Sequence, residues 1–131
     1  MTGIVLFAHG STIASANDAV RSVTAGLARR VGHALFETAF LDCAPPTLSE
    51  AVKSLITLGS DRIVVIPYFL TLGVHLQHDL PRIVREIESI HPGVVVEVTE
   101  PLDGHPALLD IVADRAVRAL NGGSRPASTL G

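Results

Sequence analysis

The sequence has few of the residues that define several large classes of protein. Its 131 residues include one cysteine, Cys43, so the chain forms no internal disulfide and has no Cys-x-x-Cys motif for zinc or an iron–sulfur cluster. Aromatic residues make up 4%, Trp is absent and the formal net charge is -3, so the stacking platforms and basic surface of nucleic-acid-binding proteins are missing. No apolar run approaches the length of a membrane span. We therefore expect a cytoplasmic protein with neither nucleic acid nor a membrane as partner.

Hydrophobic residues, in contrast, are plentiful. They make up 47% of the chain, which is enough to build a core in a protein of this size without disulfides or structural zinc. The length matches one domain, and we predict that domain over residues 1–121. Residues 122–131 are small and polar and include Pro126, so they are predicted to form a flexible tail.

Apolar runs and stretches of helical period alternate four times along the chain, which is typical of repeated βα units around a parallel sheet. The predicted strands cover residues 3–8, 34–41, 63–66 and 94–98, and the predicted helix faces lie within residues 16–31, 48–56, 80–90 and 108–120. We expect a flavodoxin-like α/β fold, a four-stranded parallel sheet in the order 2-1-3-4 with helices on both faces, in which right-handed crossovers put the carboxyl ends of all four strands at one edge. The third helix is predicted to follow a long loop, residues 67–78, with Asp79 as its N-cap and Pro81 near its first turn.

Histidines gather at one edge of this predicted sheet. The carboxyl ends of parallel strands share an edge, where open α/β sheets bind their ligands. His9 follows the first strand, and His75 and His78 lie in the long loop after the third strand. Because the first and third strands are neighbours in the predicted order, we expect His9 to face a histidine of that loop.

The segment His9-Gly10-Ser11 follows the first strand directly. Gly10 allows a tight backbone turn there, and Ser11 and Thr12 are candidates to cap the next helix. A histidine phosphatase would carry Arg in place of Ala8, and an α/β-hydrolase would need Gly-x-Ser-x-Gly, which the sequence lacks. Position alone therefore leaves His9 either as a turn residue or as a functional one.

The long loop offers two further ligands for a metal. His75 and His78 are three residues apart, a spacing that can converge on one ion, although His78 is also explained as a solvated residue beside the helix cap. Two imidazoles from separate loops, with a carboxylate nearby, suit Fe, Co, Ni or Zn better than Ca or Mg. Within this segment we therefore favour His75 as a metal ligand and keep His78 as a further candidate.

These loops together carry a family resemblance. The matching segments are residues 6–11 with His-Gly-Ser, residues 40–42 before a Pro-containing loop, residues 63–70, Gly73-Val74-His75, Asp79-Leu80-Pro81, Pro101-Leu102 and His105-Pro106. In this order they resemble the short-form sirohydrochlorin chelatases, class II chelatases of the CbiX and SirB type, over nearly the whole chain to about residue 120.

The resemblance implies a lyase that inserts a divalent metal into the tetrapyrrole sirohydrochlorin. The metal would be Co²⁺ for cobalamin or Fe²⁺ for siroheme, with Ni²⁺ as a further candidate, and it is a substrate, so no organic cofactor is expected. His9 and His75 are implied as the catalytic and metal-binding residues. Asp42 is the candidate carboxylate, because Pro45 stands where relatives often carry an acidic residue. The candidate substrate-binding residues are Gly10, Ser11, Thr12, Leu72, Gly73 and Val74.

The small size of the chain bears on its partners. A flat macrocycle needs two walls and a domain of this length supplies mainly one, so we expect a homodimer, as the resemblance also implies. A non-catalytic carrier of metal or tetrapyrrole that uses the same histidines is the alternative hypothesis. A phosphoryl-transfer enzyme is a more distant one, because the sequence offers neither a basic anchor nor an acidic cluster.

The remaining histidines and the cysteine are predicted to be structural. His33 and His91 fall at the opposite edge of the sheet, and His105 precedes Pro106 in a turn that caps the last helix. Cys43 is expected to be a small buried residue, the usual state of a free cysteine.

Overall fold

The computed structural model describes residues 1–123, so the predicted tail, residues 122–131, lies almost wholly outside the described residues. The chain divides into two compact units, residues 1–101 and the remainder from Leu102 onward. The first unit contains β1 (Thr2–Ala8), α1 (Ala14–Val31), β2 (Leu35–Phe40), α2 (Leu48–Thr57), β3 (Arg62–Pro67), α3 (Val74–Ile90) and β4 (Val95–Val98). The second contains α4 (Pro106–Leu120). The single domain expected over residues 1–121 stays a prediction.

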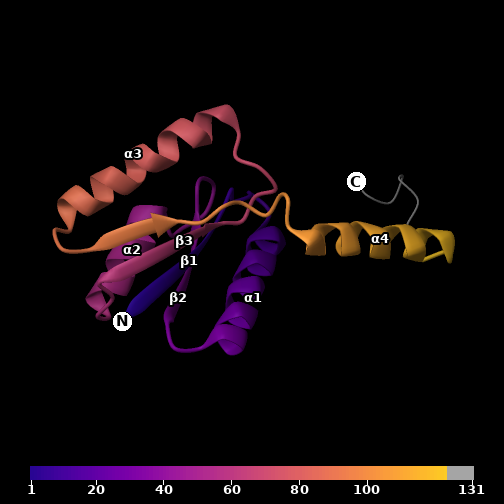
Figure 1. The fold of residues 1–131 in the computed structure, drawn as a ribbon, viewed down its shortest axis with the longest axis horizontal. Helices are drawn as coiled ribbons and strands as arrows, with labels where there is room; N and C mark the ends of the chain where they lie inside the picture. The colour runs from indigo at the N-terminus through magenta and orange to yellow at the C-terminus, as the bar shows by residue number, and fades with distance from the viewer. Residues whose placement is uncertain (124–131) are drawn as a thin grey trace. The chain divides into compact units, whose positions relative to one another are not determined.

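The sheet has the predicted topology. Its four strands are parallel and follow the order β2-β1-β3-β4, so β1 is hydrogen-bonded to β2 on one side and to β3 on the other (Figure 1). Leu6 of β1 pairs with Thr38 of β2 and with Ile66 of β3. Since the strands run in one direction, their carboxyl ends meet at the same edge of the sheet.

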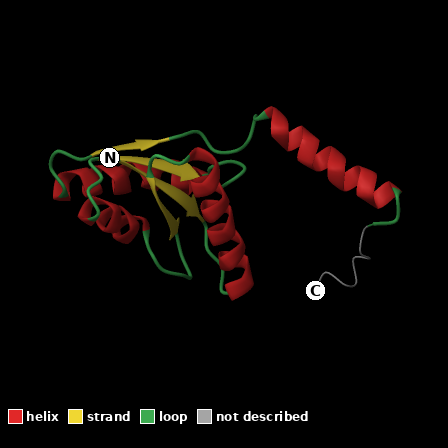
Figure 2. Cartoon of the chain, turned by 90° about the horizontal axis from the view of Figure 1, so that it is seen from below, coloured by secondary structure: helices red, strands yellow, loops and turns green. Residues whose placement is uncertain are grey.

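Helices cover both faces of the sheet in the first unit, with the strands between α1 and the other two helices (Figure 2). The main core lies under α2 and α3, where Phe7 of β1 and Ile63 of β3 meet Leu55 of α2 and Ile87 of α3. Each of these four side chains is at most 2% exposed. Apolar side chains on this face of the strands are therefore buried where α2 and α3 pack on the sheet.

The third helix begins earlier than the sequence suggested. Helix α3 starts at Val74 with Gly73 as its N-cap, so His75, His78 and Asp79 all lie on the helix and the preceding loop is residues 68–73. The prediction of a long loop ending at an Asp79 cap was therefore wrong. Proline favours the first turn of a helix, which suggested a start near Pro81, but here Pro81 lies inside α3.

The second helix begins with a capping box. The Thr47 side chain accepts a hydrogen bond from the backbone N–H of Glu50 at 3.2 Å, and the Glu50 carboxylate accepts one from the Thr47 N–H at 2.8 Å. These two bonds satisfy backbone donors that a helix start leaves free. Hydrogen bonds to the Glu50 carboxylate from the backbone and side chain of Thr47 hold the pKa of Glu50 below its usual value. Gly59, with φ 107°, follows the end of this helix.

Helix α4 belongs to the second unit and is described by itself. The predicted cap at His105 is confirmed, because its ring Nδ1 accepts a hydrogen bond from the backbone N–H of Ala107 at 3.0 Å, with Pro106 at the first helical position. None of the residues in Pro106–Leu120 is buried, although Leu109, Val112 and Leu120 are apolar. Within residues 1–123, every helix is too short or too polar to span a lipid bilayer.

Candidate functional site

An open cavity of about 310 Å³ lies at the carboxyl edge of β1 and β3, and two of the predicted ligands line it. His9 follows the last residue of β1, and His75 lies in the first turn of α3, which follows β3. Both side chains are exposed to solvent. The cavity is lined by His9, Leu41, Phe69, Gly73, Val74, His75, Leu76 and Asp79. His9 and a histidine from the segment after the third strand therefore border the same cavity, as expected for neighbouring first and third strands.

The His9 ring is oriented by its own turn. Its Nδ1 lies 3.1 Å from the backbone carbonyl oxygen of Gly10. Because that carbonyl can only accept, the contact is a hydrogen bond when Nδ1 carries the proton, and Nε2 then keeps its lone pair. A hydrogen bond from one ring nitrogen to a carbonyl is the usual way in which proteins present the other nitrogen to a metal.

The loop after β2 packs directly against the loop that carries His9. The β-ladder continues beyond both strands, since the Leu41 N–H donates to the Ala8 carbonyl and the Asp42 N–H donates to the His9 carbonyl, each at 2.9 Å. Gly10 has φ 92°, and a Cβ placed on it would lie 1.9 Å from the Asp42 carbonyl oxygen. Glycine at this position therefore permits both the turn and the close approach of the two loops.

Asp42 lies beside this site without lining the cavity. One of its carboxylate oxygens accepts a hydrogen bond from the backbone N–H of Cys43 at 2.8 Å. Cys43 has φ 68° and is exposed, so the expectation that it is a buried core residue was wrong. Tight turns lie at the protein surface more often than strands and helices of the core do. Cys43 lies in such a turn, and it is exposed to solvent.

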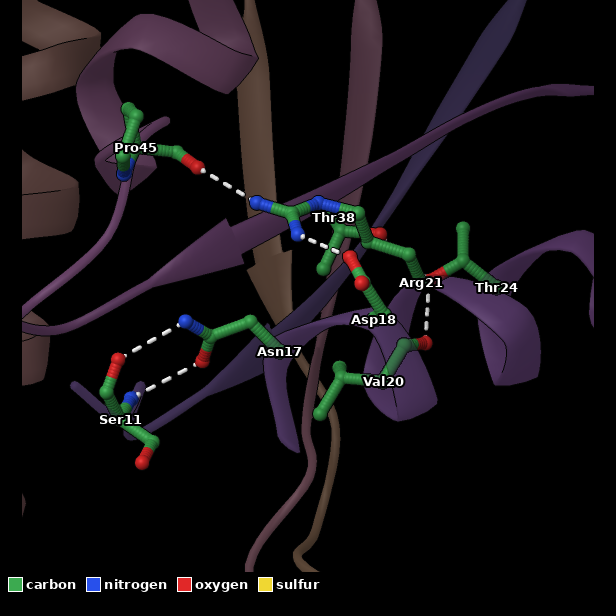
Figure 3. A network of polar contacts seen from close by, with 8 residues as sticks. All are labelled: Ser11, Asn17, Asp18, Val20, Arg21, Thr24, Thr38 and Pro45. Atoms are coloured by element: carbon green, nitrogen blue, oxygen red, sulfur yellow. Dashed lines mark hydrogen bonds and ion pairs between the residues drawn. The ribbon is translucent and has the colours of Figure 1, made fainter. Parts of the chain in front are cut away.

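Helix α1 braces both loops, as Figure 3 shows. The Asn17 carboxamide makes two hydrogen bonds to the backbone of Ser11, and the guanidinium of Arg21 donates to the Pro45 carbonyl at 3.2 Å. Helix α1 itself begins after Ile13, which makes no side-chain cap. The predicted capping of this helix by Ser11 or Thr12 was wrong, because the Ser11 hydroxyl instead accepts from the Ile13 N–H at 3.0 Å.

Only some of the predicted substrate-binding residues line the cavity. Gly73 and Val74 line it, whereas Gly10, Ser11, Thr12, Leu72 and His78 are absent from its lining. Leu76 also lines it, and Leu41, Phe69 and Asp79 line it without having been predicted. Asp79 follows His75 by one helical turn, so placing the helix start at Val74 would have brought both residues to one face. The Asp79 carboxylate also lies 3.6 Å from the Arg82 guanidinium.

The cavity holds two imidazoles and the Asp79 carboxylate in an otherwise apolar lining. In the part of the chain that the structure describes, no three His, Cys, Asp or Glu side chains come close enough together to hold a metal ion. Two histidines leave most coordination positions of a transition metal open. Val74, which lines the cavity, is 71% exposed, so apolar surface lies beside the ligands. The arrangement suits transient metal contact beside a molecule that presents apolar surface.

Comparison with known proteins identifies the family of this chain. The model of the CbiX family matches residues 3–119, which is most of the chain. The chain belongs to the CbiX family.

Similarity to individual proteins agrees with the CbiX assignment. A sirohydrochlorin cobaltochelatase of Sulfolobus acidocaldarius is 30% identical over 121 residues, covering 92% of this chain and 94% of that protein. The chloroplastic sirohydrochlorin ferrochelatase of Arabidopsis thaliana is 29% identical over 119 residues, or 91% of this chain, but the match spans only 53% of that protein. This CbiX-family chain thus aligns with nearly the whole length of the cobaltochelatase and with about half of the ferrochelatase.

A solved structure confirms the fold. The sirohydrochlorin chelatase SirB from Bacillus subtilis subspecies spizizenii, solved in complex with cobalt, superposes with a TM-score of 0.82 at 23% identity. The match covers 88% of this CbiX chain and 49% of the SirB chain. The four-stranded parallel sheet with its helices is therefore the fold of one half of a longer chelatase.

Proposed function

We propose that this CbiX-family protein is a sirohydrochlorin chelatase that inserts Co²⁺ or Fe²⁺ into its tetrapyrrole substrate. The observation that carries the proposal is the meeting of His9 and His75 in one open, largely apolar cavity. The names of relatives such as the cobaltochelatase and the ferrochelatase supply the reaction class. The metal is a substrate of this reaction, and the chemistry requires no organic cofactor.

Insertion of a metal into a tetrapyrrole requires two changes at the ring. Two pyrrole N–H protons must leave, and the hydrated metal must exchange its waters for ring nitrogens. Neutral imidazole can bind a transition metal through one nitrogen and can also accept a proton. His9 and His75 therefore provide the two functions that the reaction needs, from two separate chain segments that can approach the ring together.

The surroundings of the histidines fit the rest of the substrate. Leu41, Phe69 and Val74 offer apolar surface to the macrocycle. Its carboxylates would be received by helix starts, because α1 and α3 both begin at this edge with free backbone N–H groups and positive partial charge. Ser11 and Thr12 add hydroxyl donors beside the cavity. This arrangement accounts for recognition of an acidic substrate by a protein with net charge -3.

The proposal is tested by following the visible absorption of sirohydrochlorin as Co²⁺ is added to the wild type and to His9→Ala and His75→Ala. We expect the wild type to turn over many times and each variant to fall to the uncatalysed rate. His78→Ala is the matched comparison, because His78 is exposed on the same helix but is absent from the cavity lining. Normal rates in both His9→Ala and His75→Ala would remove the assignment. Binding of one equivalent without turnover would favour the carrier hypothesis instead.

The choice of metal is tested in the same assay. Affinity of nitrogen ligands for divalent metals follows a general order that does not by itself select Co²⁺ or Fe²⁺. Parallel reactions with Co²⁺, Fe²⁺ and Ni²⁺, the last as a comparison, measure which metal gives the highest kcat/KM. A clear preference for Co²⁺ would support a place in cobalamin synthesis, and a preference for Fe²⁺ would support siroheme synthesis.

We further propose that the active form is a homodimer whose two cavities face each other. Two histidines per chain form an incomplete ligand set, and Val74, which lines the same cavity, is 71% exposed. The SirB chain is about twice as long as the segment it shares with this chain, as expected if a second copy supplies here what a second half supplies there. Each copy would provide one wall for the flat substrate.

A charge introduced at the cavity rim tests the homodimer. Val74→Asp places a carboxylate on a side chain that is 71% exposed beside His75, whereas Leu58→Asp changes a side chain that is 66% exposed at the far end of α2. Sedimentation is expected to show a dimer for the wild type and for Leu58→Asp, and a monomer with little activity for Val74→Asp. A wild-type monomer that metallates sirohydrochlorin at full rate would refute the homodimer.

A cytoplasmic location is part of the same proposal. The free thiol of Cys43, the single cysteine of the sequence, is exposed and fits a reducing compartment. Fractionation of the source cells, with activity measured in each fraction, tests the location directly, and activity confined to a membrane or secreted fraction would contradict it.

A further inference from the structure

We propose that Asn17 is a positioning residue of the metal site, because its side chain fixes the loop that carries His9. The inference rests on the proposed function, which gives His9 its role toward the metal. Asn17 lies in the first turns of α1 and is 6% exposed, so it is a buried polar residue that must find its hydrogen bonds within the protein.

Both ends of the Asn17 carboxamide bind the same residue. The Ser11 N–H donates to the Asn17 Oδ1 at 2.9 Å, and the Asn17 Nδ2 donates to the Ser11 carbonyl at 2.8 Å (Figure 3). This is the pairing that a neighbouring strand would give to Ser11, here supplied by a side chain. A carboxylate at residue 17 could only accept and an aliphatic side chain could do neither, so asparagine matches the loop as no other residue of its size does.

The loop between β1 and α1 is consequently held on both sides of Gly10. On one side, the His9 carbonyl accepts from the Asp42 N–H at 2.9 Å. On the other, Asn17 fixes the backbone of Ser11. Gly10, with φ 92°, has no side chain to restrict its own rotation. Without the Asn17 bonds, Ser11 would keep only the bond from the Ile13 N–H to its hydroxyl, and the Gly10 carbonyl that orients the His9 ring would be less firmly placed.

A second buried polar residue on α1 separates this role from ordinary support of the fold. Thr24 is 7% exposed, and its hydroxyl lies 2.7 Å from the Thr38 hydroxyl of β2. Thr24 lies further along α1 than Asn17 and bonds to a strand, whereas Asn17 bonds to the loop beside His9. Loss of either side chain removes buried hydrogen bonds and lowers stability, but only loss of Asn17 is expected to change the metal site.

The experiment compares Asn17→Ala, Asn17→Asp and Thr24→Val with the wild type. Metallation of sirohydrochlorin gives KM for Co²⁺ and kcat, and urea denaturation gives stability. For Asn17→Ala we expect KM for Co²⁺ to rise about 10- to 100-fold, the effect usual for residues that orient metal ligands. Asn17→Asp keeps the acceptor for Ser11 and should still fold if the alanine variant does not, with a raised KM. Thr24→Val should lose stability with an unchanged KM.

An equal change of KM in Asn17→Ala and Thr24→Val would overturn the proposal, because both would then act through general destabilisation. A KM within twofold of the wild type in both Asn17 variants would also overturn it. The imidazole NMR signals of His9 and the exchange rate of the Ser11 amide report the same inference without substrate. If the wild type fails to metallate sirohydrochlorin, the proposed function fails, whereas unchanged His9 and Ser11 signals in Asn17→Ala refute the role of Asn17.

Discussion

Replacement of Gly10 by alanine is the sharpest test of how the site is assembled. Gly10 has φ 92°, which disfavours any residue with a Cβ, and the added Cβ would lie 1.9 Å from the Asp42 carbonyl oxygen. Because that oxygen belongs to the backbone of the neighbouring loop, one of the two loops must move. Gly59 provides the comparison, since it has φ 107° but nothing within 4 Å of an added Cβ.

The two glycines allow the cost of the clash to be separated from the cost of the backbone conformation. A left-handed conformation costs an alanine about 1–2 kcal/mol, and this applies to both positions. Any stabilisation from reduced freedom of the unfolded chain is also common to both. Forcing extra volume into a packed contact costs about 1–3 kcal/mol more, and this applies at Gly10 alone. We therefore expect Gly10→Ala to be about 1–3 kcal/mol less stable than Gly59→Ala.

Urea denaturation of both variants measures this difference, and steady-state metallation measures its effect on the site. Gly10→Ala should raise KM for Co²⁺, because the His9 loop and the Asp42 loop are pushed apart, whereas Gly59→Ala should leave KM unchanged. Equal stabilities of the two variants, together with equal KM values, would refute the contact between the two loops as the reason for glycine at this position.

The capping box of α2 gives two further predictions. Thr47→Ala should destabilise the protein by about 1 kcal/mol without altering metallation, as urea denaturation and the absorption assay would show. The hydrogen bonds from Thr47 hold the pKa of Glu50 below its ordinary value of 4.5, so the carboxylate stabilises the fold above that pH and the stabilisation is lost as pH falls through the lowered pKa. Glu50→Gln keeps the box but does not titrate, so its stability should fall less steeply on acidification; equal slopes would contradict this account.

The sheet could be predicted from the sequence because its determinants are local. Continuous apolar runs such as residues 63–66 identify buried parallel strands, and four alternating βα units match the flavodoxin-like order. The position of His9 and His75 at one cavity followed from the order of the strands alone. The start of α3 could not be predicted in the same way, because Asp79 and Pro81 form a plausible helix start and Gly73, the true N-cap, makes no side-chain cap.

The supports of the site were beyond sequence reasoning for a different reason. Asn17 lies within the first turns of a helix, where asparagine has no strong preference, and its partner Ser11 is outside the helix. Contacts of this kind depend on how the chain folds back on itself. The same holds for Leu41, which reaches the cavity from the loop after β2.

The exposed thiol of Cys43 makes the protein easy to observe in solution. It is the single cysteine of the chain and follows Asp42 in the loop that contacts the His9 turn. A fluorinated thiol reagent would therefore label the native protein at one position without any mutation. High-spin Co²⁺ is paramagnetic and shifts nearby fluorine signals, so a single labelled sample could report the arrival and departure of the metal during turnover.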